Sequence, residues 1–155
     1  MSIQLNIGDH TSPVPNYVPF RAQHLAPMRW ARNRARAIAR GSPQADRYFV
    51  TLPRGRSLTG LLADNSIWVN FNPVITYFGE AIVGGSELAV GRGAFAIGRW
   101  TVLATLIHEL AHINGAPGGN SKQAEEALLA TGLGRQSEKG GVDDPWTPYN
   151  PNIQG

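Results

Sequence analysis

Residues 101–114, TVLATLIHELAHIN, restrict what this chain can fold into more than any other stretch. Apolar side chains occur at nearly every position around its helical wheel, and this pattern predicts a buried helix with no face for solvent. The same segment nevertheless contains His108, Glu109 and His112. Burying these three polar side chains without partners would cost several kcal/mol, a cost that a bound metal ion removes. The segment therefore predicts a central helix that holds a metal.

The spacing of the two histidines favours zinc. A helix turns about 100° per residue, so His108 and His112 lie on one face, with their Cβ atoms about 6 Å apart. Two imidazole nitrogens can then point at one ion, as tetrahedral Zn²⁺ requires. Glu109 follows the first histidine, where a carboxylate can hold a metal-coordinated water and take its proton. We expect His108 and His112 to bind Zn²⁺ and Glu109 to be the catalytic base.

The pattern H-E-x-x-H resembles that of the zincin metallopeptidases. Uncharged neighbours such as Leu106 and Leu110 agree with that family, whereas Asn114 departs from it, because an apolar residue is usual there. The match is confined to this helix and its flanks. The resemblance implies a small α+β domain with Zn²⁺ as cofactor, and a zinc-dependent metalloendopeptidase that hydrolyses peptide bonds in protein or peptide substrates.

A catalytic zinc site needs a third protein ligand, with the fourth position open. The metzincin pattern would place a histidine where this chain has Gly118, so that option fails. Resemblance to gluzincins implies a glutamate from a following helix, here predicted at 122–131. Helical placement favours Glu125, with Glu126 as an alternative. The ordinary alternative is that both acids only stabilise the start of that helix.

A third option resembles aspzincins, in which an aspartate completes the site. Asp143 or Asp144 would then be the ligand, although the spacing around them does not match that family. Tyr149 would be a candidate donor to the oxyanion of the tetrahedral intermediate. The sequence leaves these alternatives open.

Composition indicates one domain without disulfides. The chain has 155 residues, 42% of them hydrophobic, which suffices for a single core. Its 18 glycines and 11 prolines predict many turns rather than a helical bundle. The absence of cysteine excludes both disulfides and a thiolate zinc site. No apolar run is long enough to span a membrane, and no secretory leader is visible at the start, which leaves localisation open.

Charge is distributed unevenly along the chain. Residues 1–60 have nine arginines against Asp9 and Asp46, a net charge of +7, whereas residues 61–155 have a net charge of −4. Much of the basic charge lies in a predicted amphipathic helix at 26–40. We interpret it as a backing helix with a solvated face. A nucleic-acid-binding domain is the alternative, but few aromatic residues interleave with these arginines.

The remaining elements predict a short, mostly antiparallel sheet ahead of the metal helix. We expect an extended N-terminal arm at 1–23, a zincin-like catalytic domain at 24–134, and a polar, proline-rich tail at 135–155, packed on the domain or mobile. The zincin resemblance makes one edge strand the surface on which an extended substrate pairs, with 67–71 as the candidate. Predicted strands lie at 3–7, 47–52, 66–71, 75–78, 81–83, 88–90 and 94–97.

A weaker resemblance concerns biological context. The run LIHELAHINGAPGG, followed by AEEALL, is similar to the C-terminal H-E-L-x-H domains of bacterial RHS and polymorphic-toxin proteins. It implies a toxin or effector protease domain that is exported as part of a larger secreted protein, with a cognate inhibitor or immunity protein as partner. The alternative that keeps zinc without proteolysis is an interaction module that the metal stabilises.

Overall fold

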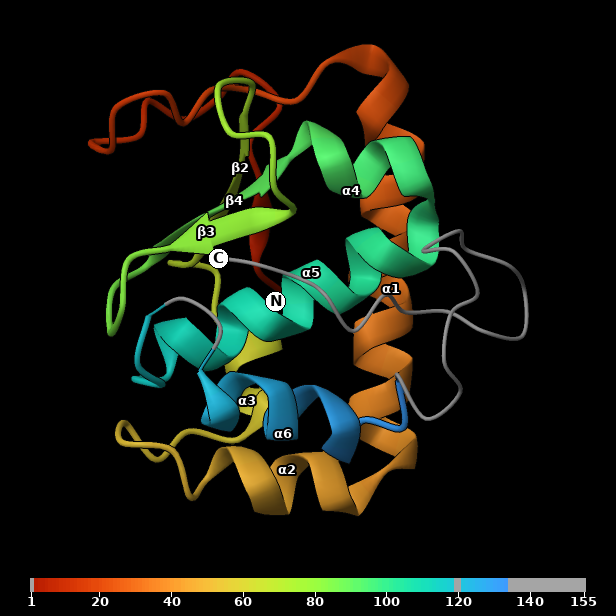
Figure 1. The fold of residues 1–155 in the computed structure, drawn as a ribbon, viewed down its shortest axis with the longest axis vertical. Coiled ribbons are helices and arrows are strands. Elements are labelled where there is room, and N and C mark those ends of the chain that lie inside the picture. The colour runs from red at the N-terminus through yellow and green to blue at the C-terminus, as the bar shows by residue number, and fades with distance from the viewer. Residues whose placement is uncertain (1, 119–120, 134–155) are drawn as a thin grey trace.

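The computed structural model describes residues 2–118 and 121–133, and these form an α+β domain as the sequence predicts. Figure 1 shows the sheet on one side, the long helix α1 on the other, and α5 crossing between them. The strands are β1 (Gln4–Leu5), β2 (Trp68–Asn72), β3 (Gly79–Ala81) and β4 (Glu87–Gly91). The helices are α1 (Ala22–Gly41), α2 (Pro43–Phe49), α3 (Leu58–Leu62), α4 (Arg92–Ile97), α5 (Arg99–Ile113) and α6 (Lys122–Ala130).

The sheet has the order β1-β2-β4-β3 and is mostly parallel. β2 pairs in parallel with both β1 and β4, and only β3 runs antiparallel to its neighbour β4. The prediction of a mostly antiparallel sheet is therefore wrong. Helices α1 to α3 separate β1 from β2, and such a crossover lets the second strand run in the same direction as the first. The predicted edge strand at 67–71 is also wrong: β2 is an inner strand, and β3 is the edge nearest to the metal helix.

Two predicted strands are helices instead. Residues 47–52 contain the end of α2, which starts with Pro43 and buries Ala45 and Phe49, four residues apart on one face. Residues 94–97 belong to α4. The prediction of a strand is wrong because a short apolar run does not distinguish a strand from a buried helical turn. The strand predicted at 75–78 is absent, and the strand near 81–83 is β3, at Gly79–Ala81. The predictions for β1, β2 and β4 are confirmed.

The three predicted helices are confirmed, with shifted boundaries. α1 begins four residues before the predicted start, so Pro27 lies inside the helix rather than in its first turn. α5 closely matches the predicted central helix. α6 begins after Ser121, whose side chain accepts a hydrogen bond from the backbone N–H of Ala124 at 3.1 Å. This capping bond fixes where α6 starts.

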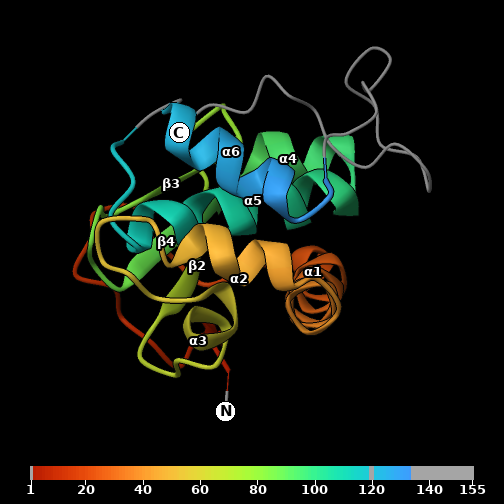
Figure 2. The same ribbon diagram turned by 90° about the horizontal axis from the view of Figure 1, so that it is seen from below.

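Helix α5 is the centre of the core. Every residue from Thr101 to Ile113 is buried, and the helix packs against α1, α4, α6, β3 and β4. Figure 2 shows the other elements arranged around it, with α1 seen end-on. Each buried Leu or Ile side chain stabilises the fold by roughly 1.5–3 kcal/mol, so the apolar side chains of α5 contribute much of the stability.

Residues 2–20 also enter the core. β1 pairs with β2, and Val18 forms an isolated antiparallel bridge with Phe71. The side chains of Tyr17 and Phe20 are buried. The segment is extended, as expected for the N-terminal arm, and it completes one side of the sheet.

Among the described residues, no helix combines the length and the apolar character that crossing a membrane requires.

Candidate metal centre

Helix α5 brings His108 and His112 together as their spacing predicts. Their Nε2 atoms are 3.1 Å apart, and their rings meet edge to face at an interplanar angle of 73°. Both side chains are 1% exposed. Two nitrogens that approach each other at this distance inside the core can converge on a single ion.

The end of α5 fixes the orientation of His112. Gly115 has φ of +96°, and the N–H groups of Gly115 and Ala116 bond to the carbonyls of His112 and Ala111, which is a Schellman motif. The turn places the carbonyl oxygen of Ala116 3.0 Å from His112 Nδ1. A proton on Nδ1 donates to this carbonyl, so the lone pair is on Nε2, the atom that faces His108. This is the tautomer that a metal ligand needs.

Glu109 is a fully buried carboxylate beside the histidine pair. Its side chain is 0% exposed, and neither oxygen has a hydrogen-bond partner within the described residues. Its Oε1 lies 3.9 Å from His108 Nε2. Burial, together with the charge of Glu80, raises the pKa of Glu109 well above its usual range. Burying a carboxylate without hydrogen-bond partners costs free energy, and a cation beside it would lower that cost.

Within the described chain, these three residues form a group that could hold a metal ion. One ligand atom from each of His108, Glu109 and His112 lies within 4.8 Å of the others. All three come from a single turn of α5, so the rigidity of that helix sets their separation. The donor set of two imidazoles and a carboxylate is one that Zn²⁺ accepts.

Glu125 and Glu126, both on α6, have different surroundings. Glu125 Oε1 lies 3.7 Å from His108 Nδ1, the ring nitrogen on the far side from His112. Glu126 accepts a hydrogen bond from the Tyr48 hydroxyl at 3.1 Å and lies 3.7 Å from the ammonium of Lys122. In this arrangement Glu125 is placed to orient the His108 ring rather than to reach the point between the Nε2 atoms.

The other candidates for the third ligand and the oxyanion donor lie outside the described residues. They are Asp143, Asp144 and Tyr149, all within the segment that begins at 134.

Strand β3 lies directly on helix α5. A Cβ atom added to Gly79 would come within 2.6 Å of Thr105 Cγ2 and 3.3 Å of Glu109 Cγ, so only glycine permits this approach. The next residue, Glu80, accepts hydrogen bonds from the Asn72 amide at 2.9 Å and from the Tyr77 hydroxyl at 3.0 Å. The two donors hold a second carboxylate in place near Glu109.

Tyr17 belongs to the same polar group. Burial raises the pKa of its phenol strongly, and the charges of Glu80 and Glu109 add to the effect. Sequence reasoning missed Tyr17, Tyr77 and Glu80, because no spacing connects them. Only the pairing of β3 with β4, and of Val18 with Phe71, brings them near the metal helix.

Asn114, which departs from the zincin pattern, has a clear structural role. Its Nδ2 donates to the carbonyls of Phe49 and Arg56, both at 2.8 Å, and its Oδ1 accepts from the N–H of Arg56 at 3.1 Å. The side chain is buried, so an apolar residue here would leave these backbone groups without partners. Asn114 thereby ties the end of α5 to the loop after α2.

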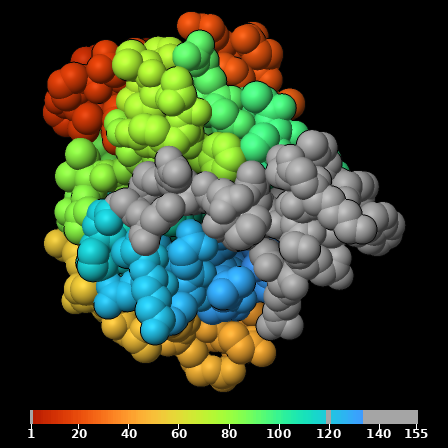
Figure 3. Space-filling view, in the orientation of Figure 1, coloured from red at the N-terminus to blue at the C-terminus, as the bar shows by residue number. Residues whose placement is uncertain are grey.

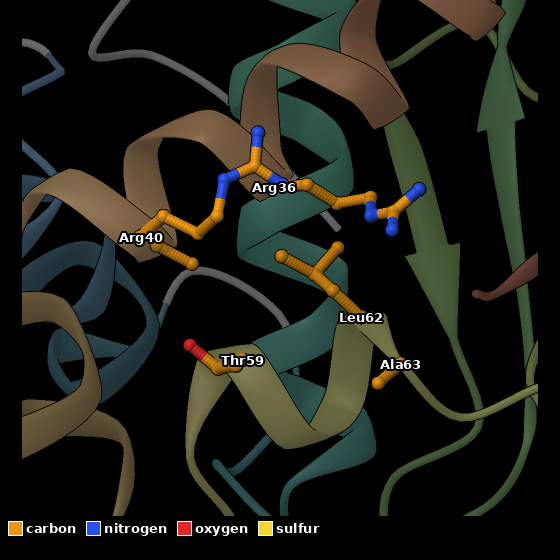
Figure 4. Close-up of a pocket in the computed structure, with 6 residues that line it drawn as sticks. Arg36, Arg40, Thr59, Leu62 and Ala63 are labelled. Carbon is orange, nitrogen blue, oxygen red and sulfur yellow. The ribbon is translucent and has the colours of Figure 1, made fainter. Parts of the chain in front are cut away.

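The basic helix α1 has a separate hollow. A cavity of about 220 Å³ lies between α1 and α3, and Figure 4 shows Arg36 and Arg40 along one side of it, opposite Thr59, Leu62 and Ala63. Elsewhere on α1, Trp30 packs edge to face on Trp100, with ring centroids 4.9 Å apart. Since Trp30 is engaged in this contact, it is poorly placed to stack on nucleic-acid bases.

Comparison with known proteins gives no family: no family model, curated protein or solved structure matches the chain.

Proposed function

We propose that this domain is a zinc-dependent metalloendopeptidase of the zincin type. The observation that carries the proposal is the pair of Nε2 atoms, 3.1 Å apart on α5, with the buried carboxylate of Glu109 beside them. An apolar helix does not tolerate such a group unless something compensates for its burial.

The donor chemistry fits zinc. His108 and His112 would hold the ion through Nε2, while the bond of His112 Nδ1 to Ala116 maintains the required tautomer. When bound, Zn²⁺ supplies a Lewis acid that polarises a carbonyl and lowers the pKa of water. For the third ligand, Glu125 stays a candidate if α6 shifts or its side chain changes rotamer, with Asp143 and Asp144 as the alternatives.

Glu109 would transfer the proton. It accepts a proton from the water whose oxygen bonds to the peptide carbonyl carbon, and then gives it to the amide nitrogen as the C–N bond breaks. Burial raises the pKa of Glu109, whereas the charge of a bound cation would favour the ionised carboxylate, which is the form that accepts the proton. The cluster also supplies fixed polar groups near the reaction, Glu80 and the hydroxyl of Tyr77.

Strand β3 would bind the substrate backbone. It is one of the two edge strands of the described sheet, it runs antiparallel to β4, and Gly79 brings it against Glu109. An extended peptide that pairs with the outer side of β3 would add a strand to the sheet. Its carbonyl groups would then lie along the metal helix. In this proposal the substrate pairs with β3 instead of with the segment at 67–71, which the sequence suggests as the edge strand.

The toxin-domain resemblance extends the proposal to biological context. A protease domain released from a larger secreted bacterial protein would act on proteins of another cell, and its producer would need a cognate inhibitor. Figure 3 shows α6, in blue, on the surface beside the residues that follow α5. A protein inhibitor that covers this side of the metal helix would block the site.

A second candidate function is a zinc-stabilised interaction module without proteolysis. It is favoured by the nearly complete burial of His108, Glu109 and His112, since structural zinc sites are closed to solvent. In such a module Glu109 would have no chemical step to perform.

The substitution Glu109→Gln separates the two functions. With casein as substrate and zinc-loaded protein, we expect cleavage to fall by about 10²–10⁴-fold while zinc stays bound. Asp9→Asn, an exposed carboxylate in the N-terminal segment, is the matched control and should cleave at the wild-type rate. Undiminished cleavage by Glu109→Gln would remove Glu109 as the base. No cleavage by the wild type, with zinc bound, would favour the structural module.

A further inference from the structure

A second hollow, of about 390 Å³, lies where β2 and β4 end and α1 and α4 begin. Arg21, His24, Phe71, Arg92 and Phe95 supply its main side chains. In Figure 1 the start of α1 lies beside α4, at the top of the molecule. The histidine pair is elsewhere: His108 lies nine residues beyond the start of α5, about 14 Å along the helix axis.

Aromatic rings form one wall of this hollow. The ring centroid of His24 lies 4.2 Å from that of Phe95, at an interplanar angle of 23°, and 4.5 Å from that of Phe71. Phe95 is only partly buried, so part of its ring is accessible. A half-covered aromatic wall of this kind suits a planar ring that stacks on it.

Positive charge surrounds the same hollow. Arg21 and Arg92 are exposed, and within the described chain no carboxylate forms an ion pair with either. The Arg21 guanidinium lies 5.5 Å from the Phe71 ring centroid. Arg21 also precedes the 20-residue helix α1, which has no side-chain cap and no acid in its first turn. The first N–H groups and the dipole of such a helix favour an anion.

His24 adds a buried polar atom that lacks a protein partner. The residue is 8% exposed, and its Nδ1 has no hydrogen-bond partner in the described structure. Burial, followed by the charge of Arg21, lowers the pKa of His24, so its ring is neutral at pH 7. A neutral imidazole can donate or accept one hydrogen bond, and an unmade bond at a buried nitrogen is costly.

The position in the sheet agrees with a ligand site. Phe71 lies near the end of β2, and Arg92 follows the last residue of β4, so the hollow is at the carboxyl ends of two parallel strands. Ligands of open parallel sheets bind in this crevice.

We propose that this hollow binds a small anion joined to a planar ring, the chemistry shared by nucleoside monophosphates and aromatic carboxylates. The ring packs against the accessible part of Phe95, beside His24, and the anion binds between Arg21, Arg92 and the start of α1. The site does not depend on the metal centre or on proteolysis.

Calorimetric titration with four probes tests the proposal: adenosine monophosphate, benzoate, adenosine and inorganic phosphate. We expect saturable binding of one or both aromatic anions at millimolar concentration or below, and the tighter one identifies the source of the ring. Adenosine and phosphate, each lacking half of the recognised chemistry, should bind at least about tenfold more weakly. The proposal would be overturned if neither aromatic anion bound. It would also be overturned if inorganic phosphate bound with the same affinity as the aromatic anions.

Matched variants locate the binding. Arg92→Gln removes an exposed charge and should weaken binding about tenfold, whereas Arg40→Gln, near the far end of α1, should leave it unchanged. His24→Phe keeps a ring in the aromatic cluster but removes the buried Nδ1 atom, so it should also weaken binding. Equal affinity in Arg92→Gln and wild type would contradict the assignment. Glu109→Gln should bind as wild type does, so this test and the protease test fail independently.

Discussion

Helices α1 and α5 are the two longest in the described chain, and they differ in how many of their polar side chains are buried. α1 buries His24, Met28, Ala31, Ala35 and Ala39 along one stripe, and three of its arginines, Arg29, Arg34 and Arg40, are exposed. α5 buries every residue from Thr101 to Ile113, including two histidines and a glutamate. Most polar side chains of α1 therefore reach solvent, whereas every polar side chain of α5 between Thr101 and Ile113 is buried.

A polar residue in the sequence points to a function only where its side chain is buried. A solvated arginine costs little, and surface charges contribute about 0–1 kcal/mol, so the arginines of α1 require no functional explanation. Burying Glu109 with both oxygens unpartnered requires one. The proposed metal site therefore lies on α5, whereas α1 is a backing helix except at its first turn.

The largest expected contrast is in packing. Leu103→Ala on α5 removes a side chain that is 0% exposed and should lower the free energy of unfolding by about 2–5 kcal/mol. Leu25→Ala on α1 removes a half-buried side chain and should cost less than half as much. Urea denaturation monitored by tryptophan fluorescence measures both. Equal losses would show that the two helices do not differ in burial as described.

A smaller effect is expected from a polar residue at the end of α5. Asn114→Ala leaves the carbonyls of Phe49 and Arg56 without the amide that binds them, and should cost about 2–3 kcal/mol. Asn33→Ala, exposed on α1, should change stability by less than about 0.5 kcal/mol. Thermal unfolding followed by circular dichroism compares the two. A neutral Asn114→Ala would mean that the loop after α2 is not held by this side chain.

The smallest effect concerns repulsion along α1. Burial lowers the pKa of Arg32, and the charges of Arg36 and Arg29 lower it further. Arg36→Gln should therefore stabilise the protein by about 0.2–0.5 kcal/mol at low salt, with less gain at high salt because ions screen the charges. Unfolding at two salt concentrations checks this. A loss of stability would indicate that Arg36 has an attractive partner.

The sequence predicted the position and burial of α5 well because the signal for this helix is local. Four-residue spacing places His108 and His112 on one face whatever surrounds the helix, and apolar neighbours on all sides predict its burial. The capped start of α6 is equally local, since Ser121 bonds within its own turn.

What the sequence could not predict depends on pairing between distant segments. Residues 47–52 have strand-like composition, but Pro43 and the burial of Ala45 and Phe49 make the segment part of a helix. Strand direction follows from the crossover through α1 to α3, which no short window shows. Glu80 and Tyr17 reach the site only through the register of β3 and the bridge at Val18.

Whether α5 binds a zinc ion through His108 and His112, as proposed, can be measured by metal analysis of the purified protein. After dialysis against micromolar zinc, we predict about one zinc ion per wild-type chain and about one in His10→Ala, a histidine outside α5. His112→Ala, with its fold checked by circular dichroism, should retain almost none. A wild-type chain that holds no zinc, or a folded His112→Ala chain that holds as much as the wild type, would contradict the account.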